Sequence, residues 1–103
     1  MELKAVSWTK EAPPTEENLR ENLEEQDLRI FRWSGQPDGA FPAHTHGYHK
    51  IIYVIDGSIK FEFPARQQAI NLNRGDRLDL PASVRHNARV GMDGVTCLEA
   101  HVY

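Results

Sequence analysis

The feature that most constrains the fold is a period of two in the hydrophobic pattern, which runs from Leu28 to the C-terminus. Short runs rich in β-branched and aromatic residues recur at intervals of roughly ten residues, separated by turn-forming residues. In Ser58–Phe63, the side chains of Ile59, Phe61 and Phe63 alternate with polar ones, so we expect these three to face inward. This pattern predicts an antiparallel sandwich or barrel, and the fold class is therefore mostly β.

Two glycine-containing segments predict where the chain reverses direction. The run Ile51–Ile55 is apolar throughout, which indicates a strand buried on both faces. Asp56-Gly57 follows it, and this dipeptide is typical of a β-hairpin because a type I′ turn needs positive φ at both central residues. We therefore predict a hairpin there. In the same way, Gly91–Gly94 is expected to separate two strands, His86–Val90 and Val95–Tyr103.

Residues 1–27 lack this period and are expected to form a short edge strand, Leu3–Trp8, followed by one short helix. Thr15 is a typical helix N-cap. Leu19 and Leu23 are four residues apart and form a narrow apolar stripe among charged residues. A chain of 103 residues has room for one domain, so we expect a single domain 1–103 with its barrel core at 28–103.

Composition excludes several classes of function. Twelve Lys and Arg against fifteen Asp and Glu leave a net charge of −3 without a basic block, so we expect no nucleic-acid partner. No apolar run approaches the roughly 20 residues that a membrane-spanning helix needs. The first residues lack the apolar core of a signal peptide. Cys97 is the only cysteine, which excludes an internal disulfide. We therefore expect a cytoplasmic protein without a membrane partner.

The histidines are the candidates for chemistry. Three of the five lie between His44 and His49. His44 and His46 are two residues apart, so in an extended segment both rings lie on one face and can converge on one metal ion. Taken alone, the pair fits two solvent-facing histidines on a strand slightly better. The rest of the chain changes that balance.

Two longer segments resemble the two sequence motifs of the cupin superfamily. The first motif, roughly G-x5-H-x-H-x3,4-E-x6-G, is similar to Gly39–Gly57, although the leading glycine is one residue too close. The second motif, G-x5-P-x-G-x2-H-x3-N, is similar to the segment from Gly75 to Val90. In that segment Ser83 replaces the second glycine and Val90 replaces the asparagine. The resemblance covers about half of the chain.

The resemblance implies an antiparallel double-stranded β-helix, the jelly-roll barrel of cupins, to which this chain adds its N-terminal helix. It further implies that His44, His46 and His86 point into the mouth of the barrel and bind a divalent transition-metal ion. Zn, Ni, Fe, Mn and Cu all suit such a site, and the sequence does not rank them.

Lys50 occupies the position at which the family usually has a metal-binding glutamate, and a protonated ammonium is repelled by a divalent ion. Three arrangements stay open. Lys50 turns away from a three-histidine site, His49 rotates in as a fourth ligand, or the pocket holds no metal and Lys50 contacts a small-molecule ligand. Tyr48 is a further candidate ligand contact and fits a loop aromatic equally well. Glu62 or Glu99 is a candidate to complete the ligand shell.

The remaining aromatic, cysteine and histidine side chains are expected to be structural. Cys97 is expected to be buried, and His101 to lie at the surface or in an interface. A set of large aromatic residues is expected in the core or in a dimer interface rather than in a ligand-binding wall: Phe31, Trp33, Phe41, Phe61 and Phe63.

The resemblance leaves three classes of function. The first is a metal-dependent enzyme of the oxygenase or isomerase type that acts on a small anionic organic molecule. The second is a non-catalytic, small-molecule-binding or sensory barrel. The third is a scaffold that has lost its metal. We expect a small-molecule ligand or substrate and a homodimer, because a small barrel has exposed edges that must be covered, with Leu3–Trp8 as a candidate pairing strand.

Overall fold

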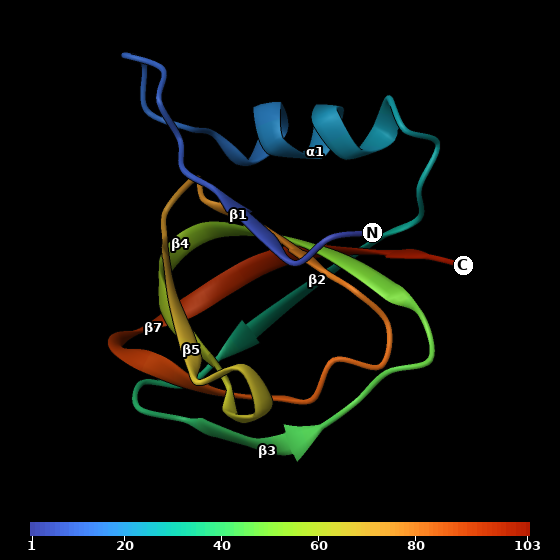
Figure 1. Cartoon of the computed structure of the whole chain (residues 1–103). Coiled ribbons are helices and arrows are strands. Elements are labelled where there is room, and N and C mark those ends of the chain that lie inside the picture. Colours follow the sequence, from blue (N-terminus) through green and yellow to red (C-terminus); the bar gives the residue numbers. More distant parts are fainter.

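The computed structural model describes residues 1–103 and consists mainly of antiparallel β-strands (Figure 1). In chain order the elements are β1 (Lys4–Val6), α1 (Glu16–Glu24), β2 (Ile30–Gly35), β3 (Ala40–His44), β4 (His49–Phe63), a 3₁₀ helix (Pro64–Arg66), β5 (Gln68–Asn73), β6 (Arg77–Leu80) and β7 (His86–Val102). The mostly β fold class predicted from the sequence is confirmed.

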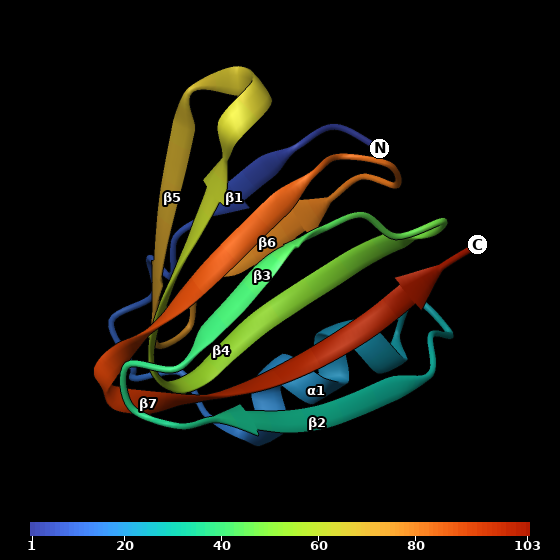
Figure 2. The same cartoon turned by 90° about the horizontal axis from the view of Figure 1, so that it is seen from below.

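The sheet is built around its two longest strands, β4 and β7, which pair with each other over most of their length. The strand order is β1-β6-β4-β7-β2, while β3 also pairs with β7 and β5 also pairs with β4. Figure 2 shows β4 and β7 side by side, with α1 lying across the sheet behind β7 and β2. The sheet thus curls around one inner face, and the helix covers part of its outer face.

Both predicted chain reversals within β4 and β7 are wrong. The chain does not turn back at Asp56-Gly57 or at Gly91–Gly94, and each strand continues through its glycines. Gly57 pairs with Val95 of β7, and the register shifts on either side of it. Gly57 and Gly94 do have positive φ, at 77° and 80°. Paired bulges use this conformation to bend both strands together while the ladder continues beyond them.

The inner face carries the larger of two hydrophobic clusters. Ile59, Phe61 and Phe63 belong to it and are 2%, 4% and 1% exposed, so their predicted inward orientation is confirmed. The run Ile51–Val54 is also buried throughout. Its alternate residues divide between the inner cluster and the cluster under the helix, as predicted for a strand buried on both faces.

The helix forms where its cap and apolar stripe predict it. The Thr15 hydroxyl accepts a hydrogen bond from the backbone N–H of Asn18 at 3.1 Å, which satisfies one free donor of the first turn. Leu19 and Leu23 are buried against the outer face of the sheet. The helix has nine residues, and no helix in the structure is long and apolar enough to cross a membrane.

The predicted N-terminal edge strand is present. β1 pairs with β6 inside the same chain, with Ala5 opposite Leu78. It is the last strand at one end of the sheet path, and β2 is the last strand at the other.

Candidate metal centre

His44, His46 and His86 come together at one end of a cavity on the inner face of the sheet. His44 is the last residue of β3, and His86 is the first residue of β7. These two residues are partners in the β3–β7 ladder, which brings positions 42 residues apart in the chain into contact. His46 lies in the loop after β3. The nitrogen atoms that the three rings offer lie within 4.8 Å of one another.

Backbone carbonyls fix the orientation of two of these rings. The Nδ1 atom of His44 lies 2.6 Å from the carbonyl oxygen of Pro42, and that of His86 lies 2.9 Å from the carbonyl oxygen of Val84. Because a carbonyl oxygen only accepts, each Nδ1 atom must carry the proton. The Nε2 atoms of both rings therefore hold free lone pairs, which is the arrangement that metal-binding histidines use.

His46 supplies the observation that fits this cluster to a metal ion. Its Nε2 atom is buried and has no hydrogen-bond partner. Its ring centroid lies 4.6 Å from that of His44 and 5.3 Å from that of His86. A buried polar atom without a partner costs about 1–3 kcal/mol. An ion shared by the three rings would satisfy this atom, so the residues present fit a divalent transition metal.

The surroundings of His46 and His86 favour their neutral imidazoles. Burial is the largest cause that lowers the pKa of His46 to about 4, and its neighbours Lys50, His44 and His86 act in the same direction. Burial also lowers the pKa of His86, against the opposing hydrogen bond to Val84. Since a metal ion binds only the neutral imidazole, His46 and His86 near neutral pH are in the form that binds metal.

We expect the metal-free protein to lose stability as the pH falls from about 6.5 towards about 4. In this window the unfolded chain takes up a proton on His46 and the folded chain does not, so acid favours unfolding. Above this window His46 is neutral in both states and contributes no pH dependence. Thermal unfolding midpoints measured with a chelator present would show the decline. His46→Gln, which does not titrate, should show a shallower decline, and equal slopes would contradict the assignment.

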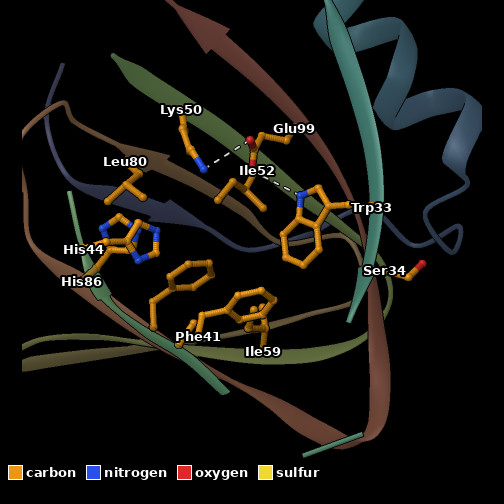
Figure 3. A pocket seen from close by; sticks show the side chains of 12 residues that line it. Trp33, Ser34, Phe41, His44, Lys50, Ile52, Ile59, Leu80, His86 and Glu99 are labelled. Carbon is orange, nitrogen blue, oxygen red and sulfur yellow. Dashed lines mark hydrogen bonds and ion pairs between the residues drawn. The ribbon is translucent and has the colours of Figure 1, made fainter. Parts of the chain in front are cut away.

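The histidine cluster adjoins a cavity of about 350 Å³ (Figure 3). The picture places His44 and His86 on one side of it, Lys50 and Glu99 on a second side, and Trp33 and Phe41 on the remaining wall. The cavity is lined by twelve residues: Trp33, Ser34, Phe41, His44, Lys50, Ile52, Ile59, Phe61, Leu80, His86, Ala88 and Glu99. Trp33, Phe41 and Phe61 were expected in the core or an interface rather than in a ligand-binding wall, and all three line the cavity. Phe61 is also a buried core residue, as expected.

Lys50 lies on the inner face and does not turn away, so the first of the three arrangements is not found. Its Nζ atom is 3.3 Å from Oε2 of Glu99 (Figure 3). The carboxylate of Glu99 pairs with this ammonium and offsets the repulsion that its charge would exert on an ion at the histidines. His49 precedes Lys50 on β4 and therefore faces the opposite way, because side chains alternate along a strand. The Nδ1 atom of His49 accepts a hydrogen bond from the backbone N–H of Ala82 at 2.9 Å, and His49 is not part of the three-histidine cluster.

The other candidate residues divide between the neighbourhood of the site and the surface. The Tyr48 ring lies beside the cluster, with its centroid 5.4 Å from that of His46, and does not line the cavity. Glu62 is exposed, so it is not available to complete the ligand shell. Glu99 lines the cavity but lies outside the cluster of metal-binding atoms.

His101 and Cys97 are both structural in this arrangement. His101 was expected at the surface or in an interface, but it is half-buried, and its Nε2 atom lies 2.6 Å from Oε2 of Glu99. Cys97 is buried as expected, and burial raises the pKa of its thiol to about 12, which keeps the thiol protonated and unreactive.

Comparison with known proteins supports the fold. No family model and no curated protein sequence matches the chain. A cupin-2 domain containing protein from Shewanella frigidimarina is similar with a TM-score of 0.63 and 20% identity, over 75% of this chain and 72% of that chain. The polyketide cyclase RemF from Streptomyces resistomycificus gives 0.65 and 22%, over 74% and 55%. A structure of DMSP lyases gives 0.68 and 20%, over 76% and 40%.

Proposed function

We propose that this chain, which has the double-stranded β-helix fold of the cupin superfamily, binds one divalent transition-metal ion through His44, His46 and His86. We propose further that it acts on a small anionic organic molecule held in the adjoining cavity. The orphaned Nε2 atom of His46 carries this proposal, because it is a buried nitrogen without a hydrogen-bond partner beside two rings whose free lone pairs are on Nε2.

The chemistry of the site follows from its ligands. A bound ion would supply a Lewis acid that polarises an oxygen atom of the ligand. Zn, Ni, Fe, Mn and Cu are the candidate ions. Three neutral imidazoles leave the double positive charge of such an ion uncompensated, so anionic ligands are favoured. The carbonyl groups of Pro42 and Val84 hold two of the rings in place, which reduces the cost of ordering them around an ion.

Two of the similar structures are of proteins named for catalysis, a polyketide cyclase and DMSP lyases. This fold therefore accommodates enzymes, although a fold alone does not define a reaction. One observation favours the alternative of a non-catalytic binding or sensory barrel. Glu99 is the one carboxylate that lines the cavity. Trp33, Lys50 and His101 already contact its oxygen atoms, so it is not free to act as a general base. Assays for turnover on bound carboxylic acids would separate the two functions.

Metal analysis of protein purified without chelator tests the proposed site. We expect one equivalent of a first-row metal per chain, either as purified or after reconstitution with each candidate ion, and calorimetric titration should give the same stoichiometry. His49→Ala is the matched control, because His49 lies outside the cluster and its loss should leave the stoichiometry unchanged. Only trace metal after reconstitution with every ion would overturn the proposal.

We also propose that the protein is a homodimer. β1 and β2 are the two ends of the sheet path, and the large side chains of Phe31 and Phe41 are 39% and 37% exposed. Pairing of an edge or burial of these rings would cover that surface. Light scattering at micromolar concentration should give twice the mass of one 11.8 kDa chain. A mass of one chain would contradict the dimer.

A further inference from the structure

Lys50 is a charged group in the cavity that the proposed metal site does not use. Its side chain is 14% exposed and lines the cavity. An ammonium group has three N–H donors. The structure gives its Nζ atom one acidic partner, Oε2 of Glu99 at 3.3 Å, and no other protein acceptor. A largely buried cation with unused donors beside an open cavity offers those donors to an acceptor group of a ligand in the cavity.

Glu99 holds this ammonium in position and is itself held from two other sides. Its Oε1 atom accepts a hydrogen bond from Nε1 of Trp33 at 3.2 Å. Its Oε2 atom lies 2.6 Å from Nε2 of His101. Because these two donors fix the carboxylate, the salt bridge fixes the Lys50 ammonium on the cavity side of the pair. Glu99 is therefore a positioning residue.

The wall that continues from this pair is apolar and aromatic. The rings of Trp33 and Phe41 meet edge to face, with centroids 5.8 Å apart, and Phe61 lies in the same lining. A volume of about 350 Å³ lies within the range of small-molecule sites, which are mostly apolar with a few placed polar groups. A ligand that fits both sides has a ring-sized apolar body and one anionic end.

We infer that the cavity binds a carboxylic acid with an aromatic or branched apolar body, whose carboxylate accepts hydrogen bonds from Lys50 and whose body packs against Trp33 and Phe41. This inference deepens the proposed function and rests on it for the role of the ion. The contact between the ligand carboxylate and Lys50 does not involve the ion, so its contribution to affinity is measurable with and without metal.

Calorimetric titration with phenylacetate and its neutral analogue phenylacetamide tests the inference. The wild-type protein and the Lys50→Met variant are each titrated with the ion bound and after removal by a chelator. Phenylacetate should bind the wild type at least about tenfold more tightly than the variant in both states, since a hydrogen bond between two charged groups is stronger than one between neutral groups. Phenylacetamide should bind both proteins equally and weakly.

Two further variants control for folding and for charge. Lys60→Met removes the same charge from the exposed face of the same strand and should leave phenylacetate binding unchanged. Lys50→Arg keeps the salt bridge to Glu99 and a cationic donor, so it should retain phenylacetate binding. If Lys50→Met fails to fold, a loss of phenylacetate binding in folded Lys50→Arg would count against the inference.

Equal affinity for phenylacetate in wild type and Lys50→Met would overturn the inference. So would a loss of phenylacetate binding in Lys60→Met as large as in Lys50→Met. No binding of phenylacetate by the wild type in either state would also overturn it. Failure of the metal site alone would look different. The ion would then not change the affinity for phenylacetate, while the difference between wild type and Lys50→Met would remain.

Discussion

His46→Ala is expected to weaken metal binding by at least about 100-fold. Loss of groups that only orient the ligands of a metal costs 10–100-fold in affinity, and loss of one of three ligands should cost at least as much. A competition titration against a chromophoric chelator measures the change.

The matched control for this substitution is His49→Ala. His49 is three residues away, but its ring accepts a hydrogen bond from the Ala82 N–H and does not join the cluster. The affinity of the His49→Ala variant for the ion should stay within about threefold of wild type, a change in binding free energy of less than 1 kcal/mol. Unchanged affinity in His46→Ala would contradict the proposed ligand set.

Gly57→Ala is expected to destabilise the fold by about 3 kcal/mol or more. An added Cβ atom would lie 2.0 Å from the carbonyl oxygen of Gly94 and 2.8 Å from its carbon. Both atoms are backbone of the paired strand, so relief of the clash requires a break in the β4–β7 pairing. The φ of 77° adds a further penalty for any residue with a Cβ. Urea unfolding monitored by circular dichroism measures the loss.

Gly47→Ala provides the comparison for Gly57→Ala. A Cβ at Gly47 would meet nothing within 4 Å, and its φ is not in the left-handed region. We expect its free energy of unfolding to stay within about 0.5 kcal/mol of wild type. If Gly57→Ala were equally mild, the tight apposition of Gly57 and Gly94 would not be required for the fold.

Local signals predicted the elements whose causes are local. The Thr15 cap depends on residues three positions apart, and the burial of Leu19 and Leu23 follows from their spacing on one helix face. The prediction of a hairpin at Asp56-Gly57 was wrong because the outcome there depends on a distant part of the chain. Gly57 does have positive φ but Asp56 does not, and the strand continues because its partner, β7, is supplied from far along the chain. A dipeptide does not specify whether such a partner exists.

Much of the candidate site was predictable from two motifs, but its second polar group was not. The motif resemblance placed His44, His46 and His86 together, and the structure brings them into one cluster. The sequence left the orientation of Lys50 open between inward and outward, because the following run, Ile51–Val54, is buried on both faces and so does not mark which face is inner.

Glu99 was one of two carboxylates considered for the site, and its position in the cavity depends on long-range register. It is opposite Ile52 in the β4–β7 ladder, which only the structure establishes. One signal could have separated it from Glu62. Glu99 is the only charged residue in the mostly apolar segment Val95–Ala100, where a buried carboxylate requires partners.

The most direct test of the metal centre is X-ray absorption spectroscopy of the zinc-reconstituted protein. The three-histidine site predicts a first shell with three imidazole nitrogens at about 2.0–2.1 Å from the ion, together with outer-shell scattering from the rings. His86→Ala should reduce the imidazole count to two. A first shell made of oxygen atoms, or one with fewer than three imidazoles in the wild-type protein, would contradict the account.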